Sequence, residues 1–214
     1  MRPADATIPS DLLSAVDALV ANQNESVAKE RCEVILRGGA HALIRPIRKQ
    51  DLALERQFLE ALSPRSSRFR FLDTIQSPNP ALVKQMVEID PSRDVALIAV
   101  IAGETGEQQI GVARLSAEPD GRRCEFAVTV SDAWQRKGLG THLMRRLSES
   151  AVARGLESMY SVDLADNDLM RGFAAHLGMR RDPDPNDSTQ VIHSIDLETF
   201  DSALQAGHLL HSLR

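Results

Sequence analysis

The stretch from Cys124 to Thr141 limits the folds open to this chain more than any other part of the sequence. Its first half, residues 124–130, alternates large apolar residues with small or polar ones, which is the period-2 pattern of a β-strand. Its second half ends with the glycines Gly138 and Gly140. From there into the following residues, apolar side chains recur every fourth position, at Leu139, Leu143, Leu147 and Ala151. That spacing predicts an amphipathic helix. The chain must therefore accommodate a strand, a short loop and a helix in direct succession.

The start of this helix predicts an anion-binding site. The first backbone N–H groups of a helix have no acceptor within the helix, and the helix dipole favours negative charge there. Glycines let a ligand approach the backbone closely. Arg136 and Lys137 add formal positive charge at the same place.

The spacing of the glycines distinguishes this loop from the sequence motifs of two common phosphate-binding loops. It lacks the third glycine of the dinucleotide fingerprint and the Gly-Lys-Ser/Thr ending of the P-loop. Residues Gln135 to Gly140 instead read Gln-x-x-Gly-x-Gly directly after a strand. This pattern resembles the acetyl-CoA signature of the GNAT N-acetyltransferase superfamily, and the resemblance extends from roughly Leu43 to Leu197. The alternative is a glycine-rich turn that only permits tight packing of strand and helix.

The composition is that of an ordinary globular protein. Of the 214 residues, 43% are hydrophobic and 26% are charged, and no apolar run approaches the roughly 20 residues that cross a bilayer. The start of the chain lacks the pattern of a signal peptide. Cys32 and Cys124 do not have the spacing of a disulfide framework or a zinc site, so we expect no bound metal. Together with the lack of a long apolar run, this favours a cytoplasmic protein without a membrane partner. A net charge of −5 disfavours nonspecific binding to nucleic acid.

The remaining sequence predicts strands and helices in a mixed order. Strand patterns occupy residues 42–47, 94–102, 109–115, 156–164 and 190–197, and helical patterns occupy residues 49–62, 79–89 and 167–177. The resemblance implies an α/β (α+β) GNAT fold, with a mixed, mostly antiparallel central sheet of about six to seven strands and helices on both faces. We divide the chain into an N-terminal helical extension (1–38), a GNAT acetyltransferase domain (39–197) and a C-terminal helical tail (198–214). A helix from Ser10 to Ala21 is expected in the extension, and one from Phe200 to Leu213 in the tail.

The resemblance also implies the cofactor and where it binds. Acetyl-CoA would place its pyrophosphate at the backbone amides of the glycine loop, whose residues are Gln135, Arg136, Lys137, Gly138, Leu139, Gly140 and Thr141. In this fold the central strand splays from its neighbour and offers free backbone groups to the pantetheine amides, here at Val128, Thr129 and Val130. Asn167 resembles the asparagine that often reaches the pantetheine or substrate, although it can equally be a plain helix cap.

Glu125 is the candidate general base. A lysine amine has a reference pKa near 10.4, so it must lose a proton before it can attack a thioester at neutral pH. A carboxylate suits that task when burial raises its pKa. Glu125 lies on the strand of residues 124–130 and resembles the proposed base of several lysine-directed GNAT enzymes, whereas the alternative is a solvent-facing strand residue.

One departure from the family pattern concerns the general acid. Many GNAT enzymes carry a tyrosine seven residues after the asparagine, to protonate the leaving thiolate, and that position is Ala174 here. The single tyrosine, Tyr160, is in a predicted strand. The acid therefore stays unassigned, and His176 nearby is more typical of a structural residue.

The leading hypothesis is an acetyl-CoA-dependent N-acetyltransferase that acts on a primary amine, with a protein lysine ahead of a small amine as acceptor. A second hypothesis is an acyl-CoA-binding regulatory module with little turnover, which the missing tyrosine keeps open. Residues 63–71 carry three arginines among two aromatics; they resemble the same region of bacterial protein-lysine acetyltransferases, or form a solvated basic helix face. The sequence is compatible with a monomer or a homodimer.

Overall fold

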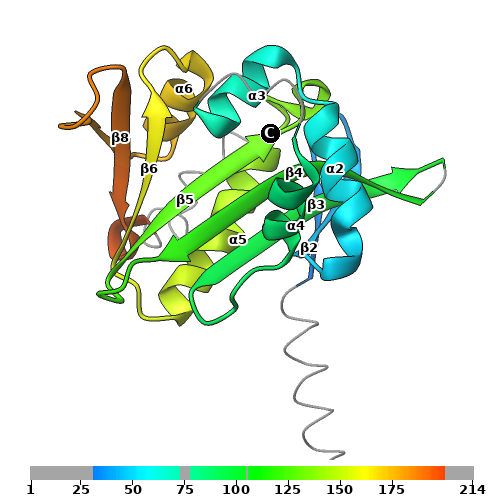
Figure 1. Cartoon of the computed structure of the whole chain (residues 1–214), viewed down its shortest axis with the longest axis horizontal. Coiled ribbons are helices and arrows are strands. Elements are labelled where there is room, and N and C mark those ends of the chain that lie inside the picture. The colour runs from blue at the N-terminus through cyan, green and yellow to red at the C-terminus, as the bar shows by residue number, and fades with distance from the viewer. Residues whose placement is uncertain (1–30, 73–77, 105, 201–214) are drawn as a thin grey trace, which may run out of the picture. The chain divides into compact units, whose positions relative to one another are not determined.

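The computed structural model describes residues 31–72, 78–104 and 106–200, which are coloured in Figure 1. Its strands are β1 (Cys32–Ile35), β2 (His41–Pro46), β3 (Asp94–Gly103), β4 (Gly106–Ala117), β5 (Arg123–Val130), β6 (Ser158–Leu164), β7 (Arg180–Pro183) and β8 (Gln190–Asp196). Its helices are α2 (Leu52–Glu60), α3 (Pro64–Phe71), α4 (Pro80–Val87), α5 (Leu139–Ala153) and α6 (Asp168–His176), with short 3-10 turns η1 (Lys49–Asp51) and η2 (Asp132–Trp134). The helix expected from Ser10 lies outside the described residues, as does nearly all of the expected tail helix.

The strands form one mixed sheet in the order β1-β2-β3-β4-β5-β6-β8-β7. Antiparallel pairing joins β2 to β3, β3 to β4, β4 to β5, β6 to β8 and β7 to β8. The pair of β5 and β6 is parallel, because α5 carries the chain from one to the other. The predicted mixed and mostly antiparallel sheet is therefore confirmed.

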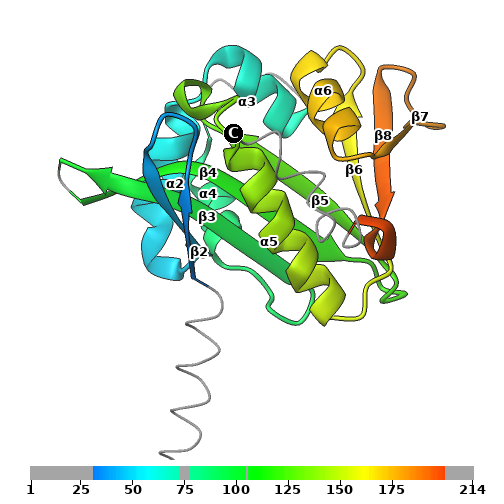
Figure 2. The ribbon, with the colours of Figure 1, turned by 180° about the vertical axis from the view of Figure 1, so that it is seen from behind.

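Helices cover both faces of the sheet, as predicted. Figure 1 shows α2 and α4 in front of the central strands, and Figure 2, from behind, shows α5 across the opposite face. The core under α2 and α4 is a cluster of buried apolar side chains that includes Phe58, Leu59, Val83, Ile98 and Val112. On the other face, Gly111 of β4 allows close packing of α5, since a Cβ there would come within 3.1 Å of Leu139 and Leu143 side-chain atoms.

The sheet has more strands than the sequence predicted, because two short edge strands have weak patterns. β1 lies within residues 1–38, which we assigned to a helical extension; of the described residues 31–38, only Val34 and Leu36 are buried. β7 consists of four exposed residues ending in Pro183. A proline is tolerated at the end of an edge strand, where its missing N–H leaves no ladder position unpaired.

Local caps fix where the helices near the sheet begin. The Ser63 hydroxyl accepts a hydrogen bond from Ser66 N at the start of α3, and Asn79 Oδ1 accepts one from Leu82 N at the start of α4. In both helices the first residue is a proline, whose missing N–H would have had no acceptor in any case. None of the helices described is long and apolar enough to cross a membrane.

Candidate active site

The parallel strands β5 and β6 separate halfway along their length. Their pairing covers only Arg123, Cys124 and Glu125 of β5, opposite Ser158, Met159 and Tyr160. Beyond this point the strands diverge, as Figure 1 shows, and a cavity of about 670 Å³ opens between them. Both strands continue to Val130 and Leu164, so each has residues on this side without a strand partner.

The mouth of this cavity is the loop that leads into α5. Gly138 caps the helix with φ 88°, a left-handed conformation that glycine adopts without steric cost, and Arg136 also has a positive φ of 59°. The first hydrogen bond of the helix runs from His142 N to Gly138 O. The amide groups of Leu139, Gly140 and Thr141 precede it, so they lack helical acceptors.

The structure brings most predicted site residues to the cavity. The predicted residues that line it are Glu125, Val128, Thr129, Val130, Gln135, Arg136, Gly138, Gly140, Thr141 and Asn167. Lys137 and Leu139 are not among the lining residues. The Lys137 ammonium lies 4.6 Å from the centre of the Trp134 ring, and the Leu139 side chain is buried in the core.

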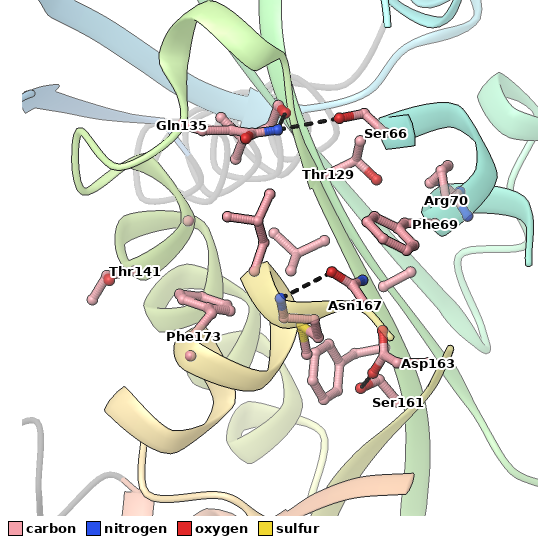
Figure 3. A pocket seen from close by; sticks show the side chains of 18 of the residues that line it. Ser66, Phe69, Arg70, Thr129, Gln135, Thr141, Ser161, Asp163, Asn167 and Phe173 are labelled. Atoms are coloured by element: carbon pink, nitrogen blue, oxygen red, sulfur yellow. Dashed lines mark hydrogen bonds between the residues drawn. The ribbon is translucent and has the colours of Figure 1, made fainter. Parts of the chain in front are cut away.

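The Gln135 side chain connects the loop before α5 to the end of β5 and to α3 through hydrogen bonds. Its Nε2 group donates to Val130 O at the end of β5 (3.1 Å) and to Ser66 Oγ of α3 (3.3 Å), as Figure 3 shows for Ser66. Ser66 Oγ in turn donates to Asp132 Oδ1 (2.8 Å), which also accepts from Ser63 Oγ (2.7 Å). The Val130 carbonyl already accepts one hydrogen bond from Gln135. Ser131 N donates to Ile110 O, so in this antiparallel register the backbone groups of Thr129 also face β4, and Val128 is the more available position for a ligand.

Asn167 is both a cap and a cavity residue. Its Oδ1 accepts a hydrogen bond from Met170 N (3.1 Å) at the start of α6, and the residue lines the cavity from the end of β6 (Figure 3). The helix-cap alternative raised by the sequence is therefore realised, and it leaves the amide nitrogen as the remaining polar atom of the side chain.

The carboxylate of Glu125 lies where the two strands separate. It is exposed, yet partial removal from water raises its pKa, and the charges of Glu118 and Asp163 act in the same direction. The positive charge of Arg70 on α3 opposes this shift. Burial and the neighbouring charge of Arg114 lower the pKa of Arg70 itself to about 10, so it is still a cation at neutral pH.

Several lining residues were not singled out from the sequence. Asp163 of β6 accepts a hydrogen bond from Ser161 Oγ (2.6 Å), and its Oδ2 lies 2.9 Å from Nδ1 of the buried His193. Phe173 of α6 lies against Gly140, where a Cβ would come within 3.3 Å of its ring. The alternation of β6 could have indicated Asp163, because alternate strand residues share a face. Phe173 and Arg37 could be recognised as lining residues only from the tertiary structure.

At the position where many GNAT enzymes have a tyrosine as general acid, the described structure has an alanine. Ala174 is buried in α6, and the Tyr160 hydroxyl donates to Glu118 Oε1 (2.8 Å). Burial, together with that hydrogen bond, raises the pKa of Tyr160 to about 12. His176 lines the cavity. Among the described residues, no group of three His, Cys, Asp or Glu side chains could hold a metal ion.

Comparison with known proteins identifies the family. The family model described as Acetyltransferase (GNAT) family matches residues 63–179. A Pseudomonas aeruginosa protein named Acetyltransferase PA5475 is 42% identical over 159 residues, covering 74% of this chain and 86% of that protein. The chain therefore belongs to the GNAT acetyltransferase family, and its activity class is that of an N-acetyltransferase.

Solved structures confirm the GNAT fold. The GNAT domain of S. lividans PAT has a TM-score of 0.72 at 24% identity, covering 79% of this chain and 98% of that chain. A cAMP-binding acyltransferase from Mycobacterium smegmatis has a TM-score of 0.54 at 23% identity, covering 92% of this chain and 61% of that chain. At these identities the likeness concerns the fold.

Proposed function

We propose that this protein transfers an acetyl group from acetyl-CoA to a primary amine in the cavity between β5 and β6. The separation of these strands after Glu125 is the observation that carries the proposal. It joins three features that the reaction needs, namely a helix N-terminus for the pyrophosphate, a free strand edge for the pantetheine amides, and a carboxylate at the closed end of the gap.

The cofactor would extend from the loop towards Glu125. The amides of Gly138 to Thr141 suit the pyrophosphate, with Arg136 as a nearby cation. The backbone of Val128 suits the pantetheine amides on one side, and Asn167 suits them on the other. This order brings the thioester to the narrow end of the gap.

Glu125 would act as the general base in a direct transfer. Its carboxylate takes a proton from the ammonium group of the acceptor, directly or through a water molecule. The amine nitrogen then forms a bond to the thioester carbonyl carbon, the C–S bond breaks, and the nitrogen releases its second proton to solvent to give the neutral amide. Coenzyme A leaves as a thiolate, because thiols are acidic enough to do so, and the thiolate takes a proton from solvent. No residue is assigned as the acid.

A second cavity favours a lysine-like acceptor. It has a volume of about 360 Å³ and shares Glu125, Phe126 and Ala127 with the first cavity. Leu82, Met86 and Ile89 give it an apolar wall, and Asp94 adds a carboxylate. Arg114 also lines it, with its guanidinium paired to Glu55. An aliphatic stem that ends in an ammonium group matches this lining, which supports lysine ahead of compact polar amines.

An acyl-CoA-binding module with little turnover is the second candidate function. Ala174 at the position of the family's tyrosine favours it, because the thiolate then leaves without a protein donor. The two functions differ in the rate of CoA release with a panel of lysine peptides and small primary amines. Release well above the rate without acceptor supports the enzyme, whereas tight acetyl-CoA binding without release by any acceptor supports the module.

The same panel separates the two acceptor classes. If the second cavity receives a lysine side chain, Gln85→Arg should raise KM for the best peptide and leave acetyl-CoA affinity unchanged, because Gln85 is exposed and lines the second cavity but not the first. The cytoplasmic location, the choice between monomer and homodimer, and the division into residues 1–38, 39–197 and 198–214 stay predictions.

A further inference from the structure

The turn between β1 and β2 is held in a defined position. Leu36 N donates to Ala40 O (2.8 Å) and Gly39 N donates to Leu36 O (2.9 Å), while Gly38 and Gly39 have φ values of 94° and 82°. The Leu36 side chain is 2% exposed, so the residue before the turn is anchored in the core. The position of Arg37 at the tip is therefore determined by its neighbours.

This turn lies directly beside the glycine loop. Arg37 N donates to Lys137 O (3.1 Å), and Arg37 lines the cavity together with Arg136 and Gly138. Figure 2 shows the hairpin of β1 and β2 next to the first turn of α5. The hairpin precedes residues 63–179, which the family model matches, so this contact involves a part of the chain outside that match.

We propose that the Arg37 guanidinium binds a phosphate group of coenzyme A, and that β1 with its turn is thus part of the cofactor site. This inference rests on the proposed function. An arginine can donate two parallel hydrogen bonds to a phosphate, and such charge-assisted bonds are stronger than neutral ones. The protein carries a net charge of −5, so a polyanionic cofactor needs local cations at its site. Arg37 and Arg136 supply two of them from different elements.

The backbone and the side chain of Arg37 have separable roles. The N–H group that donates to Lys137 O is present in any residue except proline, so a side-chain replacement keeps this contact. A residue that served only to fix the loop would tolerate loss of the guanidinium. A residue that binds phosphate would not.

The test measures dissociation constants by titration calorimetry for the wild type, Arg37→Ala and Arg37→Lys. The ligands are acetyl-CoA and acetyl-dephospho-CoA, which lacks the 3′-phosphate. Arg181→Ala is the control, because Arg181 is exposed on β7 and does not line the cavity. We expect Arg37→Ala to weaken acetyl-CoA binding roughly tenfold, Arg37→Lys to weaken it less, and the control to leave it unchanged.

The two ligands separate the possible results. A loss confined to acetyl-CoA means that Arg37 binds the 3′-phosphate, and an equal loss for both ligands means that it binds the pyrophosphate. Folded Arg37→Ala and Arg37→Lys with the affinity of the control would overturn the proposal. A wild type that binds neither ligand would contradict the proposed function instead, so the two failures are distinguishable.

Discussion

Glu125 lies on the boundary between two cavities and is affected by charges of both signs. Asp163 and Glu118 add negative charge near it, while Arg70 adds positive charge from α3. Its pKa is raised on balance, because removal from water is the largest effect. Since the base is active only as the carboxylate, the rate should rise with pH through this raised pKa.

Replacing its charged neighbours should move this pH dependence in opposite directions. Arg70→Gln removes the charge that opposes the shift, so the acidic limb of kcat/KM should move to higher pH. Asp163→Asn removes a negative charge, so the limb should move to lower pH. Full pH profiles of both variants check the two signs.

Arg65→Gln serves as the matched control on the same helix, since Arg65 is not among the charges that shift the pKa of Glu125. Its profile should coincide with that of the wild type. Shifts of the same sign in Arg70→Gln and Asp163→Asn would contradict the assignment of Glu125 as the titrating base.

Gly140 is sensitive to side-chain size because of its contact with α6. A Cβ at this position would meet the Phe173 ring at 3.3 Å, so a valine must displace either the ring or the loop. We expect Gly140→Val to weaken acetyl-CoA binding roughly tenfold or more, and Gly140→Ala to weaken it less. Calorimetric titration gives both affinities, and thermal melting shows whether the variants are folded. A folded Gly140→Val variant with wild-type affinity for acetyl-CoA would contradict the assignment of this loop to the cofactor site.

At the scale of elements, an ion pair joins β2 to the start of α2. Arg45 Nη1 lies 2.7 Å from Asp51 Oδ2, both side chains are almost fully buried, and Glu107 of β4 also pairs with Arg45. Burial alone would raise the pKa of Asp51, but hydrogen bonds from Arg45 and from Arg48 N hold it below its usual value. The pair therefore stabilises the fold above the pKa of the unfolded state, and this contribution is lost as the pH falls through the folded-state pKa.

Asp51→Asn should lower the free energy of unfolding at neutral pH. Removing one partner of a buried pair costs roughly 3–5 kcal/mol, and the lower end is expected because Glu107 still pairs with Arg45. Denaturant unfolding at pH 7 and at acid pH measures the effect, with the exposed Asp182→Asn as control. The difference from wild type should shrink at acid pH; a difference that stays constant would show that Asp51 titrates normally.

The elements with long, regular patterns could be predicted from sequence, and the short edge elements could not. β5 and α5 have 8 and 15 residues, enough to display their periods clearly. β1 has 4 residues, one of them buried, and the contact of Arg37, in the turn after β1, with Lys137 joins residues that are remote in sequence. Gln135 was predicted to bind the cofactor from its place in the motif, but its bonds to Val130 and Ser66 became visible only in the fold.

At the scale of the whole molecule, the sheet order leaves a cavity on each of two sides of β5. β5 is central and pairs with β4 along its length, but with β6 over only three residues. The first cavity lies on the side of β6, and the second lies towards α4 and β3. Glu125 lines both, as the proposed approach of an acceptor amine and a thioester to the same carboxylate from different sides requires.

The measurement that tests this account most directly compares Glu125→Gln with wild type in two assays. One is steady-state CoA release with the best acceptor of the panel, and the other is the dissociation constant for acetyl-CoA. Glutamine keeps the shape but cannot take a proton, so turnover should fall by roughly 10² to 10⁴ while the affinity holds and the melting temperature changes little. Turnover within a few-fold of wild type in a folded Glu125→Gln protein would contradict the account.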